Sequence, residues 1–252
     1  MRSVGVYIIN LDRATARWDF IKKNVEELGL PIHRISAVDG KTLSKEFIRQ
    51  HVDSKTYKNR FKMYPERGTI GCSLSHEKVW REFLKSDYDF ALVFEDDVEF
   101  NPQDLKNCVE KAIEKSDLWD ILSFEILHDG CPLKIDDLGY KNNFLAIYLT
   151  NVTHAGCYLI NRKAAERFLK QFYPITIPVD HYIPAGWMFD LKFLGVEPRI
   201  VYQTFGDSQI KTLDTVKFND VPTKMYNAIY NIKRAITHFC YNLKVYLSHK
   251  WK

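Results

Sequence analysis

The acidic triplet Glu95–Asp97 follows a run of apolar residues and is the strongest chemical signal in this sequence. The apolar run, Phe90–Phe94, is typical of a strand that is buried on both faces. Asn101 and Pro102 then predict the start of a helix, with Asn as the N-cap and Pro at the first helical position. We therefore expect the three carboxylates at the carboxyl end of a buried strand, the edge of an α/β sheet where ligands bind.

Adjacent carboxylates repel one another, so a positive partner is expected among them. Mg²⁺ and Mn²⁺ prefer oxygen ligands and bridge to substrate phosphates. The triplet therefore predicts a site where Mn²⁺ or Mg²⁺ holds a phosphate group. A solvated acidic turn after a core strand is the alternative, and the residues alone leave both interpretations open.

Two other predicted strands end in polar residues. The strand Val4–Leu11 ends in the run Asn10-Leu11-Asp12-Arg13, and Asp39 follows the strand His33–Val38. In a doubly wound sheet these ends lie beside the triplet and would receive a nucleotide. Asp39 is placed to accept a hydrogen bond from a base or a ribose hydroxyl, although an Asp-Gly turn explains it equally well.

The segment Arg67–His76 carries glycines at the start of a predicted helix, Gly68–Ser86. Free backbone N–H groups at a helix start attract phosphate. An ordinary helix start explains the same residues, because isolated Gly-x-x-Gly pairs are common. We expect His76 to be a packed histidine rather than a ligand.

Composition is that of an ordinary globular protein. The chain has 252 residues, of which 46% are hydrophobic and 27% charged, and its net charge of +4 is too small to indicate nucleic acid as the main partner. The five cysteines lack metal-ligand spacing, so we expect reduced thiols in a cytosolic protein. The apolar run Val4–Leu11 is too short for a signal peptide, and no stretch is long enough to span a bilayer.

Alternating strands and helices predict a single α/β domain over residues 1–220, with a mostly parallel sheet and helices on both faces. One short helix and a loop are expected in 41–67, and a loop in 128–143. Asp12 is expected to cap the first helix. The predicted strands are Val4–Leu11, His33–Val38, Phe90–Phe94, Asp120–Ile126, Phe144–Leu149, Ala155–Ile160 and Glu197–Gln203.

The tail, residues 221–252, contains lysine and arginine but no acidic residue. Its apolar residues follow steps of four and three, which predicts an amphipathic helix. They are Met225, Ile229, Ile232, Ile236, Phe239, Leu243 and Leu247. Aromatic residues and an uncompensated basic face favour a helix on an anionic membrane surface. A helix packed back on the core and a dimerising coiled coil are the alternatives.

Several segments together resemble glycosyltransferase family 25, which includes bacterial lipooligosaccharide galactosyltransferases and collagen galactosyltransferases. They are INLDRATAR (Ile9–Arg17), RISAVDGK (Arg34–Lys41), GTIGCSLSHEKVW (Gly68–Trp80), ALVFEDDV (Ala91–Val98), GCYLINRKAAERFL (Gly156–Leu169) and PVDHYI (Pro178–Ile183). They occur in the family's order and cover most of the chain from Ile9 to about Ser208. The tail beyond Asp220 lies outside the resemblance.

The resemblance implies a GT-A fold and an inverting transfer of a hexose from a UDP-sugar, usually UDP-galactose. In such folds an acidic motif holds Mn²⁺ or Mg²⁺ against the diphosphate, and the triplet fills that place. Asp97 is the first choice of metal ligand and Glu95 the second. A further ligand stays open among Gln203, Asp207 and His154. The residues assigned to the donor are Asn10, Leu11, Arg17, Asp39, Arg67, Gly71, Ser75 and Asp96.

The reaction also needs a base that stands apart from the metal, to take the proton from the attacking acceptor hydroxyl. Asp180 matches the PVD of the family and is our choice, although a helix N-cap explains it too. Asp190 is the fallback. It is less favoured than Asp180, because it falls inside the helix that is predicted to begin at Asp180. We assign His154, His181 and Trp187 to acceptor binding, with core packing as the alternative for Trp187.

The expected protein is therefore a metal-dependent galactosyltransferase that extends lipooligosaccharide at the cytoplasmic face of a bacterial inner membrane. Its partners would be a UDP-sugar, a lipid-linked oligosaccharide and an anionic membrane surface, while a homodimer stays open. A metal-dependent phosphohydrolase using the same carboxylates is the alternative enzyme. A degenerate transferase domain that only binds saccharide is the alternative without catalysis.

Overall fold

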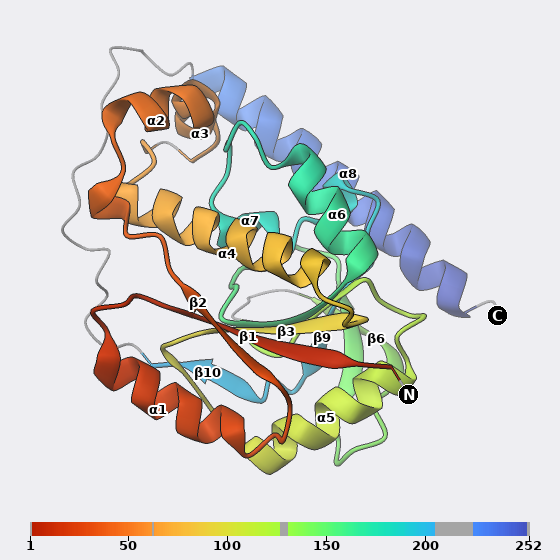
Figure 1. The fold of residues 1–252 in the computed structure, drawn as a ribbon. Coiled ribbons are helices and arrows are strands. Elements are labelled where there is room, and N and C mark those ends of the chain that lie inside the picture. Colours follow the sequence, from red (N-terminus) through yellow and green to blue (C-terminus); the bar gives the residue numbers. More distant parts are fainter. Residues whose placement is uncertain (1, 62, 127–130, 205–223, 251–252) are drawn as a thin grey trace.

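A computed structural model describes residues 2–61, 63–126, 131–204 and 224–250 of the chain (Figure 1). The strands of its main sheet are β1 (Val4–Asn10), β2 (Ile32–Ser36), β3 (Phe90–Glu95), β5 (Ile121–Ser123), β6 (Pro132–Asp137), β7 (Phe144–Tyr148), β8 (Cys157–Asn161) and β9 (Phe193–Glu197). They lie in the order β2-β1-β3-β8-β5-β9-β7-β6. Only β8 and β7 run against the others, so the predicted mostly parallel sheet is confirmed.

Helices cover both faces of this sheet (Figure 1). On one face lie α1 (Thr15–Glu26) and α5 (Pro102–Glu114), and on the other lie α4 (Arg67–Lys85), α6 (Arg162–Gln171) and the short α7 (Val179–Tyr182). Successive residues of a strand point to opposite faces. Along β1, Tyr7 therefore packs in the core with the residues of α4, while Ile8 packs in the core with those of α1. Every residue of β1 is buried, as the apolar run predicts.

The strands that carry the predicted site residues end side by side. Both β2 and β3 pair in parallel with β1, and in this register Ile9 is opposite Glu95 while Asn10 is opposite Ser36. The short antiparallel pair of β4 (Val98–Phe100) and β10 (Val201–Gln203) forms directly after β3. The acidic triplet thus lies at the carboxyl edge of the sheet, as predicted.

Three local predictions about elements are wrong. The segment 41–67 forms a 3₁₀ turn, η1 (Gly40–Thr42), and two helices, α2 (Lys45–His51) and α3 (Ser54–Phe61), because Ile48 and Tyr57 are buried and anchor them. The expected loop of 128–143 contains β6, whose pairing with β7 satisfies its backbone. The last predicted strand is split into β9 and β10, which belong to different sheets.

The caps of the helices follow the sequence in two cases and depart from it in one. Asn101 and Asn161 each accept a backbone N–H at the start of α5 and α6, as expected for N-caps. The N-cap position of α1 is Ala14 and not Asp12. Asp12 instead accepts a hydrogen bond from the Ser36 hydroxyl at 2.7 Å, so it joins the ends of β1 and β2.

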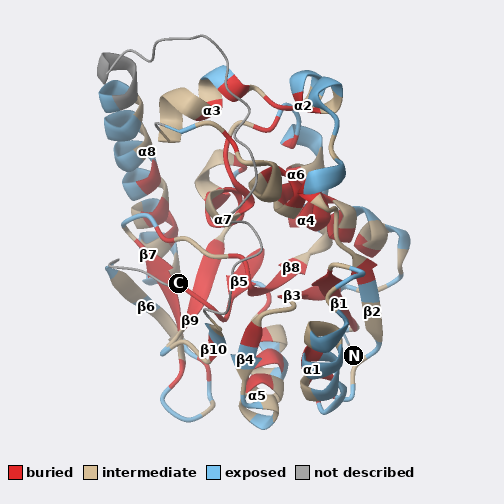
Figure 2. Ribbon diagram, turned by 90° about the vertical axis from the view of Figure 1, so that its left-hand side faces the viewer, coloured by how far each residue is buried: buried red, intermediate tan, exposed pale blue. Residues whose placement is uncertain are grey.

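The tail forms one long helix, α8 (Lys224–Lys250), which lies against the body of the molecule (Figures 1 and 2). None of the helices that the structure describes is both long and apolar enough to cross a membrane. The five cysteines are free thiols. The predicted domain boundary after Asp220 falls outside the described residues.

Gly71 lets α4 approach the segment that follows β2. A Cβ atom at this position would lie 2.5 Å from the carbonyl oxygen of Val38 and 2.9 Å from the backbone nitrogen of Gly40. Both neighbours are backbone atoms, so relief requires movement of the chain. We predict that Gly71→Ala lowers the free energy of unfolding by about 1–3 kcal/mol in urea denaturation. Lys85→Ala, at an exposed position of the same helix, is the control, and an equally small effect of both changes would contradict this packing.

Candidate active site

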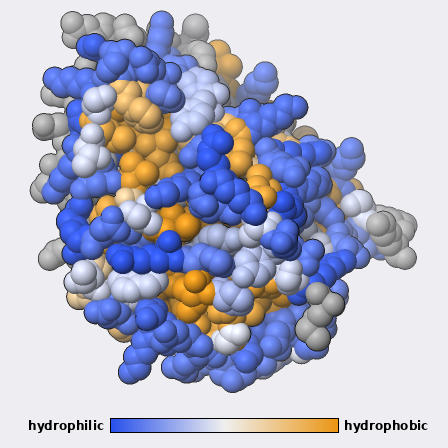
Figure 3. Space-filling view, viewed as in Figure 1, coloured by the Kyte–Doolittle hydropathy of each residue, from blue (hydrophilic) through white to orange (hydrophobic). Residues whose placement is uncertain are grey.

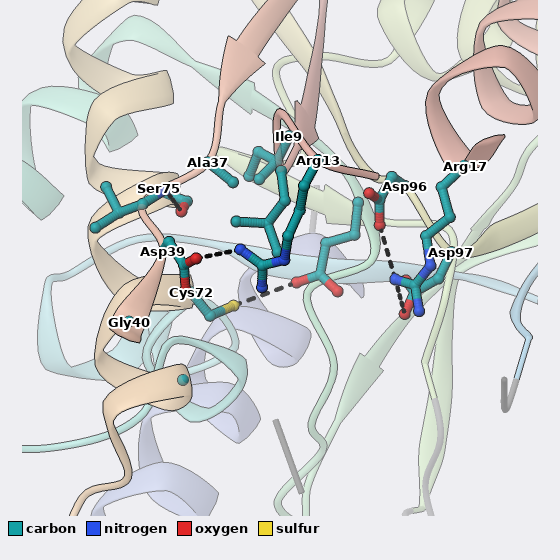
Figure 4. A pocket seen from close by; sticks show the side chains of 14 residues that line it. Ile9, Arg13, Arg17, Ala37, Asp39, Gly40, Cys72, Ser75, Asp96 and Asp97 are labelled. Atoms are coloured by element: carbon teal, nitrogen blue, oxygen red, sulfur yellow. Dashed lines mark hydrogen bonds and ion pairs between the residues drawn. The ribbon is translucent and has the colours of Figure 1, made fainter. Parts of the chain in front are cut away.

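A cleft opens at the carboxyl edge of β1, β2 and β3 (Figure 4). Its walls come from these strand ends and from the first turns of α1 and α4. The residues that line it are Ile9, Leu11, Arg13, Arg17, Ala37, Val38, Asp39, Gly40, Gly68, Cys72, Ser75, Glu95, Asp96 and Asp97. All three members of the acidic triplet therefore border one cleft. On the face seen in Figure 1, hydrophilic surface surrounds smaller apolar patches (Figure 3).

Asp97 has an unsatisfied carboxylate. Its Oδ1 atom is buried and has no hydrogen-bond partner, whereas Oδ2 accepts a hydrogen bond of 3.2 Å from the Gln203 amide. Burial, together with the negative charges of Glu95 and Asp96, raises the pKa of Asp97 to about 7. A buried oxygen without a donor is costly. A cation would supply the missing partner, and this fits the prediction of Asp97 as a metal ligand.

Asp96 is already engaged by the protein. It accepts hydrogen bonds from the Asn10 amide at 2.6 Å and from the Arg17 guanidinium at 3.1 Å. The same guanidinium lies 3.8 Å from Asp97 (Figure 4). The Arg34 guanidinium donates to Oδ1 of Asn10 at 2.6 Å. Asp96 thus lines the cleft and holds Arg17 beside the triplet, whereas the predicted donor residue Asn10 is buried, does not line the cleft and supports Asp96 through its amide.

Glu95 is held by two residues of α4. Its Oε1 atom accepts from His76 at 3.1 Å and from the Cys72 thiol at 3.5 Å. Since a carboxylate only accepts, the His76 ring donates from Nε2, and its Nδ1 atom faces the Tyr158 hydroxyl at 2.9 Å. Burial alone would raise the pKa of Glu95, but the hydrogen bond and charge of His76 outweigh it and lower the pKa. His76 is fully buried, as expected for a packed histidine.

Cys72, His76 and Glu95 also have ligand-like spacing, because their ligand atoms lie within 4.8 Å of one another. Glu95 accepts hydrogen bonds from both Cys72 and His76, so these two residues of α4 hold Glu95 in place. Glu95, the second predicted metal ligand, therefore offers the cleft mainly its other oxygen. Asp207, one of the three candidates for the further metal ligand, lies outside the described residues.

The other predicted donor residues divide into two groups. Leu11, Asp39 and Ser75 line the cleft, and Asp39 forms an ion pair with Arg13, which also lies at the predicted end of the first strand and lines the cleft (Figure 4). Ser75 accepts from the backbone N–H of Val38 at 2.8 Å. Arg67 and Gly71 do not line the cleft. Arg67 donates to the carbonyl of Leu43, and Gly71 packs behind the loop after β2.

A second cavity adjoins this cleft, and Cys72 and Glu95 line both. Its lining residues are Tyr57, Phe61, Met63, Thr69, Cys72, Glu95, His154, Ala155, Gly156, Pro178, Val179, Asp180, His181 and Gln203. The predicted base and two predicted acceptor residues thus meet in one cavity. Trp187, the third, instead lines a smaller cavity together with His181 and His238.

The two candidate bases are in different surroundings. Pro178 occupies the N-cap position of α7, so the interpretation of Asp180 as an N-cap is wrong. The prediction that Asp190 falls inside a helix is wrong. Asp190 follows the 3₁₀ turn η2 (Gly186–Met188), has a φ of 52° and lies 3.1 Å from the Arg167 guanidinium. Asp190 does not line the second cavity.

Glu125, which the sequence analysis did not single out, fixes His154 in the second cavity. Glu125 is buried, accepts the backbone N–H of Gly156 at 3.0 Å and lies 2.9 Å from Nδ1 of His154. His154 has a φ of 97°, a conformation that side chains other than glycine rarely adopt. The hydrogen bond to Glu125 raises the pKa of His154. The available signal was the position of Glu125 within the predicted strand Asp120–Ile126, because a carboxylate buried among apolar residues needs a partner.

Comparison with known proteins gives the family. Residues 4–183 match the family described as "Glycosyltransferase family 25 (LPS biosynthesis protein)". A "Glycosyltransferase 25 family member" of Aedes aegypti is 30% identical over 189 residues, which are 71% of this chain and 30% of that protein. "Procollagen galactosyltransferase 2" of Homo sapiens is 26% identical over 225 residues, which are 79% of this chain and 35% of that protein.

Among solved structures, the S. aureus TarS fragment 1–349 aligns with a TM-score of 0.46 and 12% identity, over 80% of this chain and 60% of that one. The chain spans about a third of the length of the curated relatives it matches. The family match covers most of the described sheet, including the acidic triplet and Asp180. The chain belongs to glycosyltransferase family 25.

Proposed function

We propose that this chain transfers a hexose, with galactose as the expected sugar, from a UDP-sugar to a saccharide acceptor with inversion at the transferred carbon. The observation that carries the proposal is the unpartnered buried oxygen of Asp97 beside two adjoining cavities. One cavity carries basic and acidic groups suited to a nucleotide diphosphate. The other carries Asp180, which is suited to a hydroxyl.

The donor would lie in the cleft of β1, β2 and β3. Mn²⁺ or Mg²⁺ fits at Asp97, with the free oxygen of Glu95 and the Gln203 amide as neighbours, and would supply neutralisation of the charge on the departing diphosphate. Arg17 is held beside the triplet by Asp96 and adds a fixed positive charge for phosphate oxygens. Asp39 and Arg13 lie at the other end of the cleft, where ribose or base hydrogen bonds are required.

The acceptor would lie in the second cavity. Asp180 would take the proton from the attacking hydroxyl, which must come from the side opposite the leaving group. The two cavities meet at Cys72 and Glu95, so donor and acceptor would meet there. Glu125 accepts from Nδ1 of His154 and so fixes the ring, whose Nε2 atom would accept from a sugar hydroxyl in the neutral form and donate to one in the protonated form. Burial lowers the pKa of His181, which favours the neutral ring as a second hydrogen-bonding group for a sugar.

The acceptor that we propose is a lipid-linked oligosaccharide, in the manner of lipooligosaccharide, at the cytoplasmic face of a bacterial inner membrane. The family description, which names LPS biosynthesis, and the basic tail without acidic residues support this choice. Release of UDP from several UDP-sugars with Mn²⁺, followed with and without saccharide acceptor, tests the reaction class. A phosphohydrolase would release product without acceptor, and a degenerate binding domain would release none.

Asp97→Asn keeps the size of the side chain and removes its charge. We predict that it lowers the rate of transfer by about 100-fold or more and weakens UDP binding in the presence of Mn²⁺, because the cation loses its charged ligand. Transfer rates and isothermal titration with UDP and Mn²⁺ measure both effects. The surface substitution Asp137→Asn is the control. Unchanged turnover in Asp97→Asn would remove the metal role of this residue.

Asp180→Asn should leave the affinity for UDP unchanged while it lowers transfer by about 100- to 10,000-fold, because the general base is lost. Asp190→Asn is the matched control, since Asp190 lies outside the cavity and should retain transfer. The two variants are compared by initial rates at saturating donor. If Asp190→Asn is the inactive one, the base has been assigned to the wrong residue.

Glu125→Gln should lower the pKa of His154 in an NMR titration, with His181 as the internal reference. The pKa of His154 is raised on folding. The ion pair with Glu125 therefore stabilises the folded state fully below the unfolded pKa of about 6.5, and this stabilisation is lost as the pH rises through the folded pKa. The loss of unfolding free energy in the variant should therefore be larger near about pH 6 than near about pH 8. An unchanged pKa of His154 would show that Glu125 does not hold it.

A further inference from the structure

Helix α8 presents an unbroken apolar stripe to solvent. The stripe residues are 43–61% exposed and account for most of the exposed large hydrophobic residues in the described chain. They are Ile229, Ile232, Ile236, Phe239 and Leu247. We call them the α8 stripe. Their spacing by three, four or eight residues places them on one side of the helix, over a length of about 27 Å from Ile229 to Leu247.

The helix is held to the body through its other side. His238, Asn242 and Val245 are buried there, with exposed fractions of 4%, 7% and 8%. The Asn242 amide donates to the carbonyl of Tyr148 at the end of β7, at 2.7 Å. Burial lowers the pKa of His238 to about 4, so its ring is neutral in this contact. The alternative of a helix packed on the core is therefore confirmed, but the predicted apolar stripe is not the packed side.

This arrangement reverses the usual order of an amphipathic helix, in which the apolar side faces the core. Exposed contiguous apolar surface on a folded protein marks an interaction site. The outer side of α8 is seen as exposed along its length in Figure 2. Lys233, Lys244 and Lys250 are exposed beside the stripe, and the sequence 221–252 contains no acidic residue.

We propose that the α8 stripe lies in the interfacial region of an anionic membrane, parallel to its plane, with the flanking lysines at the level of the lipid phosphates. A helix with a continuous apolar side, basic flanks and no acid has the pattern of such interfacial helices. Each lysine near an anionic leaflet strengthens binding through its charge. The five stripe side chains supply the apolar burial, so charge and hydrophobic contact act together.

Charge favours lipid over a second copy of this chain. If two stripes packed against each other, the lysines of both helices would be brought together with no carboxylate from either helix to pair them, and like charges in such positions destabilise helix contacts. An anionic leaflet supplies the missing negative charge. The occupant that fits the stripe is therefore a lipid surface.

The position of α8 relates the membrane to the acceptor cavity. The helix contacts α3 and η2, and the Arg60 guanidinium of α3 lies 4.8 Å from the ring centre of Tyr230. Tyr57 and Phe61 of the same α3 line the cavity that holds Asp180. A membrane-bound α8 would thus place that cavity next to the bilayer, where a lipid-linked acceptor is found. This last step rests on the proposed function, whereas the membrane contact does not.

Co-sedimentation of the full chain with vesicles tests the proposal. The wild-type protein should bind vesicles of phosphatidylcholine with phosphatidylglycerol and bind pure phosphatidylcholine far more weakly. The double substitution Ile232→Ser and Ile236→Ser should weaken binding to the mixed vesicles by about tenfold or more. Both side chains are about 60% exposed, so the fold should tolerate the change, and urea unfolding checks this.

Phe20→Ser on α1 is the matched control, because Phe20 is 49% exposed but lies outside the stripe, and it should bind as the wild type does. Lys233→Glu with Lys244→Glu should abolish the preference for anionic vesicles. Transfer to a soluble acceptor should stay unchanged in every variant, which separates this proposal from the reaction itself. Wild-type protein that ignores anionic vesicles, or a wild-type dimer that the serine pair converts to monomer, would overturn the proposal.

Discussion

The structure depends on how mutual repulsion within the triplet Glu95–Asp97 is relieved at the edge of a buried sheet. Two of its carboxylates are compensated by the protein: Glu95 by His76 and Cys72, and Asp96 by Arg17 and Asn10. Asp97 is left with a buried oxygen that has no partner, and its pKa rises to about 7. A site in which two carboxylates are hydrogen-bonded by the protein and one buried oxygen of the third lacks a donor is prepared for a cation.

The fold places this charge between two chemical environments. Parallel pairing of β1 with β2 and β3 brings the residues of the first cleft together, whereas β8 and the segment before it bring His154 to the second cavity. Helix α4 borders both, because Ser75 and Cys72 line the first cleft while Thr69 and Cys72 line the second cavity. An inverting transferase needs this division, because the acceptor hydroxyl must reach the transferred carbon from the side opposite the leaving group.

Strand ends and family motifs were enough to predict the sheet, the triplet at its edge and the convergence of Asp97 with Asp180 in adjoining cavities. Contacts that depend on topology were not predictable. Glu125 meets His154 only because β5 pairs with β8, and Arg13 meets Asp39 only because β1 pairs with β2. The periodicity of the tail predicted a helix, but its packed side is set by the burial of His238 and Val245 and by the hydrogen bond of Asn242 to the Tyr148 carbonyl, which no sequence pattern reveals.

The most direct test of the central claim is a crystal structure with UDP and Mn²⁺, in which the anomalous signal of manganese locates the ion. The account predicts a peak within coordination distance of Asp97, with the diphosphate beside Arg17 and the nucleoside extending toward Asp39. A manganese peak away from Asp97, or UDP bound at another edge of the sheet, would contradict it.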